Sequence, residues 1–538
     1  MVFNSSFPPI HYQPSDTFSA VFFNGNIPKE RINKPALIDG VTNEQYTYGQ
    51  LLTKITSLAA YLHSIGVKRG DVIAIYSPNH IQYPVVIYAA VKLGAVVTTA
   101  NPNYLASEFA YQLQDSGAKF IFSHDSVLQN ALEAGSQAKI PKSKVFVFGS
   151  KKVGSHLSID DMVGLGASKV QSLPVVKYTP RQLKEDTAYL CYSSGTTGRS
   201  KGVMTTHDNL VSNIHQLYAF EKMDEKDTTI GVLPFYHIYA LNIYLHFGLW
   251  RGTTIVVQSK FDLVAFLGMI ETYKVTILFI VPPIAIGMAK HPIVSKYNLS
   301  SVKFAMSGAA PLGNEVSEEF TKRLGIPIKQ GYGMTETSPV THSNPMDKIV
   351  TGSIGVLAPS VQAKLVDPDG NELGYDQEGE LCVRGPNIMK GYLNNEKATK
   401  ETIINGWLHT GDVARVNKDG YFFIVDRIKE LIKYKGLQVV PAELESYLLG
   451  HPAIADAAVI PRPDANAGEI PKAYVVLKPG AKATELEIQQ YIESKTSYHK
   501  WLRGGVEFIN EIPKSAAGKI LRRILRDMDK KNLAKAKL

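Results

Sequence analysis

The chain has 538 residues, of which 44% are hydrophobic and 20% charged, so it is long enough for more than one domain and too apolar for wholesale disorder. Its formal net charge of +9 is compatible with binding to nucleic acid or to anionic small ligands. We expect small ligands and no nucleic acid, because no basic stripe with interleaved aromatic residues is visible.

Cysteine usage and the apolar runs bear on disulfide bonding, secretion and membrane insertion. Cys191 and Cys382 each stand in an apolar, strand-like segment, which argues against a disulfide framework and against a catalytic thiol. Residues 1–13 carry no basic residue before an apolar run, so they do not resemble a secretory signal. The most apolar window, residues 275–288, is too short to cross a bilayer and contains two prolines. We expect a soluble protein without a transmembrane segment.

From about residue 46 the chain alternates between helical and strand-like periodicity. The segments in order are helix 48–65, strand 71–76, helix 83–93, strand 187–192, helix 209–220, strand 229–233, helix 263–273 and strands 277–281 and 302–307. Such alternation predicts an α/β fold with parallel sheets and crossover helices.

The character of the chain changes after residue 350. Short β segments between residues 354 and 383, separated by a Pro-Asp-Gly-Asn turn, predict a β-rich subdomain at about 350–428. Beyond it follows a compact α/β unit with helices from Pro441, at 485–494 and at 520–528, and with strands at 457–460 and 473–477. We place the boundary near Lys429, giving a large domain of residues 1–428 and a small one of residues 429–538.

Residues 193–203 read Ser-Ser-Gly-Thr-Thr-Gly-Arg-Ser-Lys-Gly-Val and follow the strand-like segment 187–192. Glycines allow close backbone approach, while hydroxyls, free N–H groups and a lysine suit phosphate oxygens. A Walker A loop is excluded, because Lys201 is followed by glycine instead of a hydroxyl residue. The alternative is a solvated Ser/Gly linker.

Three later segments carry candidate ligands. Residues 331–336, Gly-Tyr-Gly-Met-Thr-Glu, form a glycine-bearing turn whose Glu336 suits a site where Mg²⁺ meets phosphate; a helix cap is the alternative. Asp412 follows a tight turn, where it could accept hydrogen bonds from ribose hydroxyls or simply be a surface residue. Lys519 ends a loop of small residues just before a helix. A lysine near a helix N-terminus interacts unfavourably with the helix dipole, so its presence there indicates that it binds a ligand.

In identity and order these segments resemble the adenylate-forming family of acyl-CoA ligases, firefly luciferases and peptide-synthetase adenylation domains, and most of all 4-coumarate:CoA ligases and their luciferase-like peroxisomal relatives. The resemblance runs from about residue 46 to the C-terminus and rests on residues 193–203, 234–239, 330–336, 379–385, 409–412, 433–438 and 518–519. It implies an ATP-dependent carboxylic acid:CoA ligase that works through an acyl-adenylate, with a small domain that rotates about Lys429.

The same resemblance implies residue roles. Catalysis falls to Lys519, which bridges the substrate carboxylate and the α-phosphate, and to His237, Thr197 and Glu336, with Glu336 also binding Mg²⁺. ATP or AMP is held by Ser193, Ser194, Gly195, Thr196, Thr197, Lys201, Gln330, Gly331, Thr335, Asp412, Arg427, Lys429, Lys433 and Gln438. Coenzyme A contacts Lys260, Lys435 and Gly436. The acid contacts Tyr239, Ile243, Met306, Ala309, Gly331, Gly333, Pro339 and Val340.

Several alternatives stay open. His237 either acts as a general base or shapes the wall between the acyl and CoA channels. Ser200 replaces the proline of many relatives without removing a phosphate contact. Ile243 replaces a small residue of many coumarate ligases, which admits hydroxycinnamate-like and other aryl acids or medium-chain fatty acids. A luciferase-like oxygenase and a non-catalytic peroxisomal binding protein are the competing functions.

The chain ends in Ala536-Lys537-Leu538, which differs from the peroxisomal address Ser-Lys-Leu by one hydroxyl. We therefore expect a peroxisomal protein that meets an import receptor through this tripeptide. The alternative is a basic tail that ends this way by chance, in which case the protein is cytoplasmic.

Overall fold

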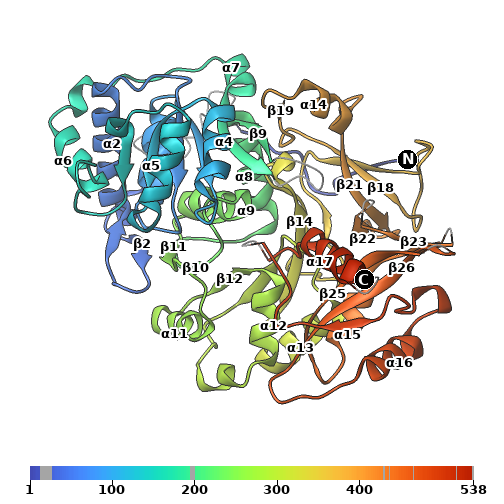
Figure 1. Ribbon diagram of the computed structural model, residues 1–538. Coiled ribbons are helices and arrows are strands. Elements are labelled where there is room, and N and C mark those ends of the chain that lie inside the picture. Colours follow the sequence, from blue (N-terminus) through green and yellow to red (C-terminus); the bar gives the residue numbers. More distant parts are fainter. Residues whose placement is uncertain are drawn as a thin grey trace.

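Figure 1 shows the computed structural model, which describes residues 1–12, 27–193, 200–427, 430–435, 437–464, 466–515 and 518–535. The large N-terminal region contains three sheets and the smaller C-terminal region a fourth, with helices packed against them. This arrangement confirms the predicted α/β fold class. Within the described residues, none of the helices combines the length and apolarity that crossing a membrane requires.

The seven-stranded sheet presents the predicted phosphate loop. In spatial order it consists of β19 (Gly391–Tyr392), β9 (Lys201–Thr206), β8 (Thr187–Ser193), β5 (Val96–Ala100), β4 (Val72–Tyr76), β6 (Ala118–Ser123) and β7 (Val145–Val147). The five strands from β8 to β7 are parallel, whereas β9 and β19 are antiparallel to their neighbours. Ser193 pairs with Lys201 across the β8–β9 hairpin, so the two ends of the loop are held together.

The nine-stranded sheet carries the second group of site residues. Its order is β16 (Val356–Leu357), β15 (Val340–Ser343), β14 (Ile328–Gly333), β13 (Phe304–Ser307), β12 (Ile277–Ile280), β10 (Thr228–Gly231), β11 (Thr254–Val257), β2 (Pro35–Asp39) and β3 (Gln45–Thr47). The six strands from β14 to β2 are parallel, and antiparallel strands flank them on both sides. Parallel strands of this kind are buried on both faces and read as apolar runs.

Helices of the large domain cover these two sheets. They are α2 (Tyr48–Ser64), α3 (Tyr83–Lys92), α4 (Ala106–Ser116), α5 (Leu128–Gln137), α6 (Ile159–Ala167), α7 (Pro180–Glu185), α8 (His207–Phe220), α9 (Ile238–Ala240), α10 (Leu249–Arg251), α11 (Leu263–Tyr273), α12 (Pro282–Lys290), α13 (Asn314–Leu324) and α14 (Glu396–Thr402). In α2 the predicted apolar stripe of Leu51, Ile55, Leu58 and Leu62 is buried, and Thr47 caps the helix. A π-helical segment, Leu241–Gly248, joins α9 to α10.

An antiparallel sheet occupies most of the predicted β-rich region. It is formed by β1 (Val2–Asn4), β17 (Gln362–Val366), β18 (Gly379–Arg384), β21 (Trp407–Val416) and β20 (Ile403–Ile404), with β22 (Phe422–Arg427) paired to β21. The chain's first residues thus join this sheet, since Phe3 lies opposite Ala363. Its interior is a hydrophobic cluster separate from that of the parallel sheets.

The small domain has its own sheet and apolar clusters. Its elements are β24 (Leu437–Val439), β23 (Ile432–Tyr434), β26 (Gly468–Leu477), β25 (Ile454–Asp464), β27 (Val506–Phe508), α15 (Pro441–Leu449), α16 (Glu485–Lys495) and α17 (Arg522–Lys535). It docks on the large domain, because Ser446 donates to Oε2 of Glu315 over 2.7 Å and Nζ of Lys290 to the carbonyl of Leu449 over 2.7 Å. The predicted hinge, Lys429, lies outside the described residues.

Candidate active site

Residues from three strands meet at the ends of the predicted phosphate loop. Ser193 Oγ donates to Oε1 of Glu336 over 3.1 Å, and the hydroxyl of Tyr392 donates to the same oxygen over 2.8 Å. The ammonium of Lys201 lies 4.1 Å from the centre of the Tyr392 ring. The structure therefore brings Ser193, Lys201 and Glu336 together, as predicted. The candidate phosphate ligands Ser194, Gly195, Thr196 and Thr197 lie outside the described residues.

The predicted turn at residues 331–336 is only partly a turn. Gly331 and Gly333 belong to strand β14, which pairs with β15 through a bulge at Tyr332 and Gly333, and a 3₁₀ turn begins only at Thr335. This corrects the expectation of a glycine turn, because pairing with β15 extends the segment as a strand. Both glycines permit close packing: a Cβ on Gly333 would lie 2.1 Å from the carbonyl oxygen of Pro339.

Gln330 stands on the same strand but uses its side chain locally. Its Oε1 accepts from the backbone N–H of Leu312 over 2.9 Å, and its Nε2 donates to the carbonyl of Leu312 over 3.1 Å. The amide thereby fixes the loop that leads into α13. A part of Gln330 in nucleotide binding stays a prediction, as does that of Thr335.

Asp412 is 5% exposed and lies inside β21, six residues after the turn at residues 405–406, so the alternative of a surface residue is wrong. Gly411, with φ of +71°, sits where the pairing of β18 and β21 shifts its register, and this bulge directly precedes Asp412. The hydroxyl of Tyr332 donates to Oδ2 of Asp412 over 2.5 Å, and Arg427 Nε lies 3.1 Å from Oδ1. Burial raises the pKa of Asp412, while Arg427 opposes the shift.

Lys519, on the small domain, lies within electrostatic range of this pair. Burial lowers its pKa to about 8, with Arg427 acting in the same direction and Glu430 and Asp412 opposing. Its loop rests on the large domain, since a Cβ on Gly518 would lie 3.1 Å from Cδ of Pro283. Helix α17 starts three residues after Lys519, later than predicted, because Ile520 still bridges to Lys514.

A narrow cavity of about 40 Å³ opens beside these groups. It is lined by His237, Ile238, Tyr239, Met306, Gly308, Ala309, Gly331, Tyr332, Gly333, Met334, Pro339 and Val340. Seven of the eight predicted acid contacts are therefore in its wall. The exception is Ile243, which lies buried in the π-helical segment and is not among the described lining residues.

His237 forms one side of the cavity. Its Nδ1 accepts the backbone N–H of Tyr239 over 3.2 Å, and burial lowers the pKa of the imidazole to about 4. A neutral histidine with so low a pKa is a weak base. The structure therefore favours the channel-wall alternative over proton abstraction.

The predicted CoA residues are not gathered at this site. Lys260 is exposed between β11 and α11, and Lys435 is exposed in the turn after β23; Gly436 lies outside the described residues. Lys433 and Gln438, which are predicted ATP or AMP contacts, pair across the β23–β24 hairpin. Among the described residues, no hydrogen bond or ion pair joins Lys433 or Lys435 to the group around Asp412.

Sequence reasoning missed two tyrosines that organise the site. Tyr332 holds Asp412, and Tyr392 holds Glu336 while lying under Lys201. The position of Tyr332 between Gly331 and Gly333 was a usable signal, since flanking glycines leave room around an aromatic ring. No local signal identifies Tyr392, which reaches the site because β19 adds to the edge of β9.

Neither cysteine is equipped as a nucleophile. Burial raises the pKa of both the Cys191 and the Cys382 thiol to about 12.

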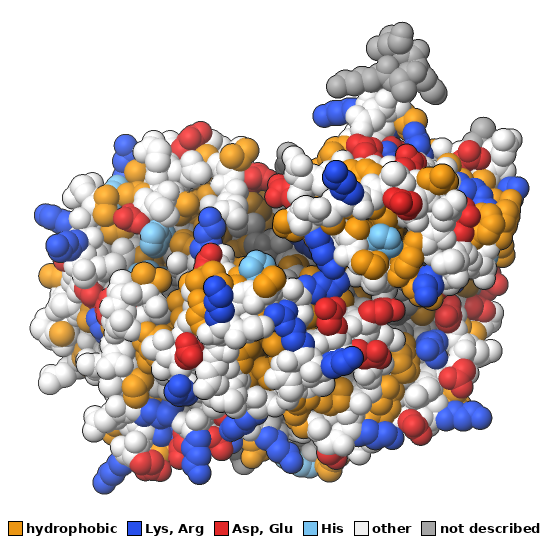
Figure 2. Space-filling view, turned by 90° about the horizontal axis from the view of Figure 1, so that it is seen from below, with side chains coloured by type: hydrophobic (Ala, Val, Ile, Leu, Met, Phe, Trp, Pro, Cys, Tyr) orange, Lys and Arg blue, Asp and Glu red, His pale blue; other side chains and the backbone are white. Residues whose placement is uncertain are grey.

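Positive and negative side chains are mixed on the surface: Figure 2 shows Lys and Arg interspersed with Asp and Glu on the face seen from below. On that face the basic residues do not form one continuous stripe.

Comparison with known proteins places the chain among nucleotide-dependent ligases. The AMP-binding enzyme family matches residues 26–393, and the AMP-binding enzyme C-terminal domain matches residues 443–519. Probable 4-coumarate–CoA ligase 2 of Dictyostelium discoideum is 40% identical over 92% of both chains. 4-Coumarate-CoA ligase 1 of Narcissus pseudonarcissus is 42% identical over 92% of this chain and 90% of its own.

Solved structures agree in fold. The anthranilate CoA ligase AuaEII in complex with anthranoyl-AMP superposes with a TM-score of 0.88 at 26% identity, covering 96% of this chain and 98% of its own. ATP-bound MatB from Rhodopseudomonas palustris gives a TM-score of 0.85 at 28% identity, covering 95% and 98%.

Proposed function

The chain belongs to the AMP-binding enzyme family, and we infer that it is an ATP-dependent, AMP-forming acid:CoA ligase that works through an acyl-adenylate. The observation that carries this function is the placement of Lys519, from the small domain, within electrostatic range of the ion pair between Asp412 and Arg427 of the large domain. A cation is thereby placed near a buried carboxylate and its half-buried guanidinium partner, beside an apolar cavity.

In the first step the substrate carboxylate attacks the α-phosphorus of ATP, the bond to the β-phosphate oxygen breaks, and pyrophosphate leaves. Negative charge accumulates on phosphoryl oxygens, so positioned cations lower the barrier most. We assign this role to Lys519 at the reacting centre and to Lys201 at the departing phosphates. In the second step the CoA thiol attacks the adenylate carbonyl, AMP leaves, and the thiol proton passes to solvent.

Asp412 can accept hydrogen bonds from the ribose hydroxyls while keeping its contacts with Tyr332 and Arg427. Each carboxylate oxygen offers two lone-pair sites, and the hydrogen bond from Tyr332 and the ion pair with Arg427 occupy one on each oxygen. The remaining two sites suit a vicinal diol. Because Tyr332 and Arg427 fix the carboxylate, it is preorganised for this contact.

The oxygen atoms around Glu336 are of the kind that Mg²⁺ prefers as ligands. A carboxylate and the Ser193 hydroxyl are hard oxygen donors, which this ion prefers. We propose that Glu336 holds Mg²⁺, which when bound neutralises charge on the phosphates. The Tyr392 hydroxyl keeps the carboxylate oriented.

For the acid we propose an aryl substrate of the hydroxycinnamate type, with other aryl acids or medium-chain fatty acids as the wider range. The cavity wall is mostly apolar, yet the Tyr239 hydroxyl in it is buried without a hydrogen-bond partner among the described residues. An unpaired buried hydroxyl favours a ligand that supplies the missing partner. This supports an acid that carries a polar ring substituent.

The test is acid-dependent exchange of pyrophosphate into ATP across cinnamate, 4-coumarate, phenylalkanoates and medium-chain acids, followed by thioester formation with CoA. A luciferase-like oxygenase would instead consume O₂ without CoA. No exchange with any acid would overturn the ligase function. Tyr239→Phe should reduce the preference for 4-coumarate over cinnamate and leave cinnamate turnover largely unchanged.

We propose that CoA contacts Lys260, Lys435 and Gly436 after the small domain turns about Lys429. This rotation accounts for the separation of these residues from Asp412 in the present arrangement.

We also propose a peroxisomal location through Ala536-Lys537-Leu538. Deleting Leu538 should leave a fluorescent fusion cytosolic, whereas Ala536→Ser should keep it imported. Import without Leu538 would show that the tail is incidental.

A further inference from the structure

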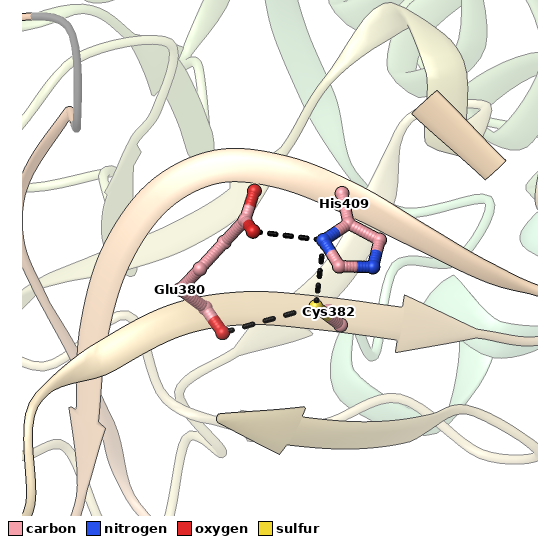
Figure 3. Close-up of side chains that lie close together, drawn as sticks. All are labelled: Glu380, Cys382 and His409. Carbon is pink, nitrogen blue, oxygen red and sulfur yellow. Dashed lines mark hydrogen bonds and ion pairs between the residues drawn. The ribbon is translucent and has the colours of Figure 1, made fainter. Parts of the chain in front are cut away.

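Three side chains with metal-binding atoms lie together on strands β18 and β21 of the antiparallel sheet (Figure 3). Glu380 and Cys382 stand on β18, and His409 lies opposite Cys382 on β21. Nδ1 of His409 is 2.8 Å from Oε2 of Glu380 and 3.4 Å from Sγ of Cys382. The three candidate ligand atoms all lie within 4.8 Å of one another, the one such group of His, Cys, Asp and Glu found among the described residues.

The combination of donors selects a particular class of ion. Thiolate, imidazole and carboxylate together suit Zn²⁺, which forms tetrahedral sites, and they do not suit Mg²⁺, which prefers oxygen. Bonds of about 2.0 to 2.3 Å place tetrahedral ligand atoms roughly 3.3 to 3.7 Å apart. The observed 2.8 and 3.4 Å differ from this by about half an ångström or less, within the reach of small side-chain movements. We propose that Glu380, Cys382 and His409 bind one Zn²⁺ ion.

Access and charge are compatible with this site. The side chains of His409 and Glu380 are 23% and 21% exposed, which leaves an open side for a water molecule as fourth ligand. The neighbouring cation, Lys364, lies opposite Cys382 on β17 but points its ammonium to Glu372, 3.3 Å away. On binding, the Cys382 thiol loses its proton to solvent and the sulfur binds as thiolate.

The site is mechanically joined to the nucleotide site. Oε1 of Glu380 accepts the backbone N–H of Gly411 over 3.1 Å, and Gly411 immediately precedes Asp412. An ion between Oε2 and His409 widens their present 2.8 Å separation and so shifts the bulge that presents Asp412. If the proposed function holds, Zn²⁺ therefore weakens ATP binding, and the site is inhibitory.

Cobalt provides a direct probe, because a thiolate bound to Co²⁺ gives an intense near-ultraviolet charge-transfer band and tetrahedral Co²⁺ gives strong visible bands. The full chain should show both bands on titration with Co²⁺, reach a plateau at one equivalent, and lose them when Zn²⁺ is added. The chain has only two cysteines, so Cys191→Ser is a matched control that should retain the bands. Cys382→Ser should lose the charge-transfer band, and His409→Gln should lower the affinity at least tenfold.

Absence of a charge-transfer band in the wild type, or its persistence in Cys382→Ser, would overturn the proposal. The effect on ATP is measured separately on enzyme loaded with one equivalent of Zn²⁺ and desalted. Its KM for ATP at saturating Mg²⁺ should rise severalfold in the wild type and in Cys191→Ser, but not in Cys382→Ser. Failure of the ligase function would remove this second readout and leave the cobalt spectra unaffected.

Discussion

Nη2 of Arg522 lies 2.7 Å from both carboxylate oxygens of Glu445, and its Nη1 lies 2.6 Å from Oε2 of Glu430. Glu430 directly follows the predicted hinge residue Lys429, and Arg522 stands three residues beyond Lys519. All three ion-pair partners are buried. Arg522 therefore joins the hinge to the segment that delivers the catalytic lysine.

Replacing this arginine should affect the two half-reactions unequally. Arg522→Met leaves buried carboxylates unpaired, which costs about 3 to 5 kcal/mol of unfolding free energy. Adenylate formation should fall at least tenfold, because the Lys519 loop loses its anchor, while thioester formation from supplied acyl-adenylate should fall less. Arg523→Met is the matched control, since its neighbour Arg523 is exposed.

Unfolding monitored by circular dichroism separates stability from positioning. If Arg522→Met does not stay folded, Arg522→Lys retains the charge and loses only the bridging geometry, so it should show the same unequal pattern more weakly. Equal loss of both half-reactions in a folded variant would contradict the role of Arg522 in positioning Lys519.

The depressed pKa of Lys519 predicts the pH dependence of adenylation. Only the protonated form can stabilise the developing phosphate charge, and burial brings its pKa to about 8 in the free enzyme. The kcat/KM for the acid in pyrophosphate exchange should therefore decline above about pH 8, approaching tenfold per pH unit. Lys519→Ala should abolish exchange yet leave the thioester step from supplied adenylate largely intact.

Stability supplies a readout independent of activity. Between pH 8 and the ordinary lysine value of 10.5, the unfolded chain binds a proton at this residue that the folded chain does not. The unfolding free energy should thus rise with pH in this window relative to that of Lys519→Met. A flat difference between the two proteins would show that burial of Lys519 does not lower its pKa.

The acid pocket can be probed through the contact of Gly331 with Met306. A Cβ on Gly331 would lie 2.3 Å from the Met306 methyl, a flexible chain end that can move, so Gly331→Ala should fold and raise the KM for aryl acids. Adding Met306→Ala removes the clash, and the two changes should couple by about 0.5 to 3 kcal/mol.

Gly333→Ala provides the contrast, because its new methyl meets the backbone oxygen of Pro339, which cannot move aside. Met306→Ala should not rescue it. Additive effects of Gly331→Ala and Met306→Ala on the KM for the acid would show that this contact does not shape the pocket.

Sequence predicts those elements whose signals are local. Helix α11 matches its predicted bounds, because Asp262 caps its start and Lys274 ends it in a left-handed conformation. The start of α17 was misplaced by two residues, since the bridge between Lys514 and Ile520 depends on the folded loop.

Site residues follow the same division. The motif ends Ser193, Lys201 and Glu336 were found from residue type and spacing. Asp412 was found too, but the bulge at Gly411 that precedes it has no local signal, because it arises from pairing with β18. Tyr392 was missed, since a two-residue strand added to β9 brings it to Glu336 and leaves no local pattern.

The charge of Glu336 can be separated from its hydrogen bonds. Glu336→Gln keeps an oxygen acceptor for Ser193 Oγ and the Tyr392 hydroxyl but removes the negative charge. If Glu336 holds Mg²⁺, the Mg²⁺ concentration for half-maximal exchange should rise at least tenfold, and kcat should fall by about 10² to 10³. Tyr392→Phe removes one hydrogen bond to a carboxylate, worth about 1.5 to 3 kcal/mol, and keeps the charge, so it should lower activity less and leave the Mg²⁺ requirement nearly unchanged. The same Mg²⁺ requirement in Glu336→Gln and the wild type would assign Glu336 to holding Ser193 and Tyr392 instead of the metal.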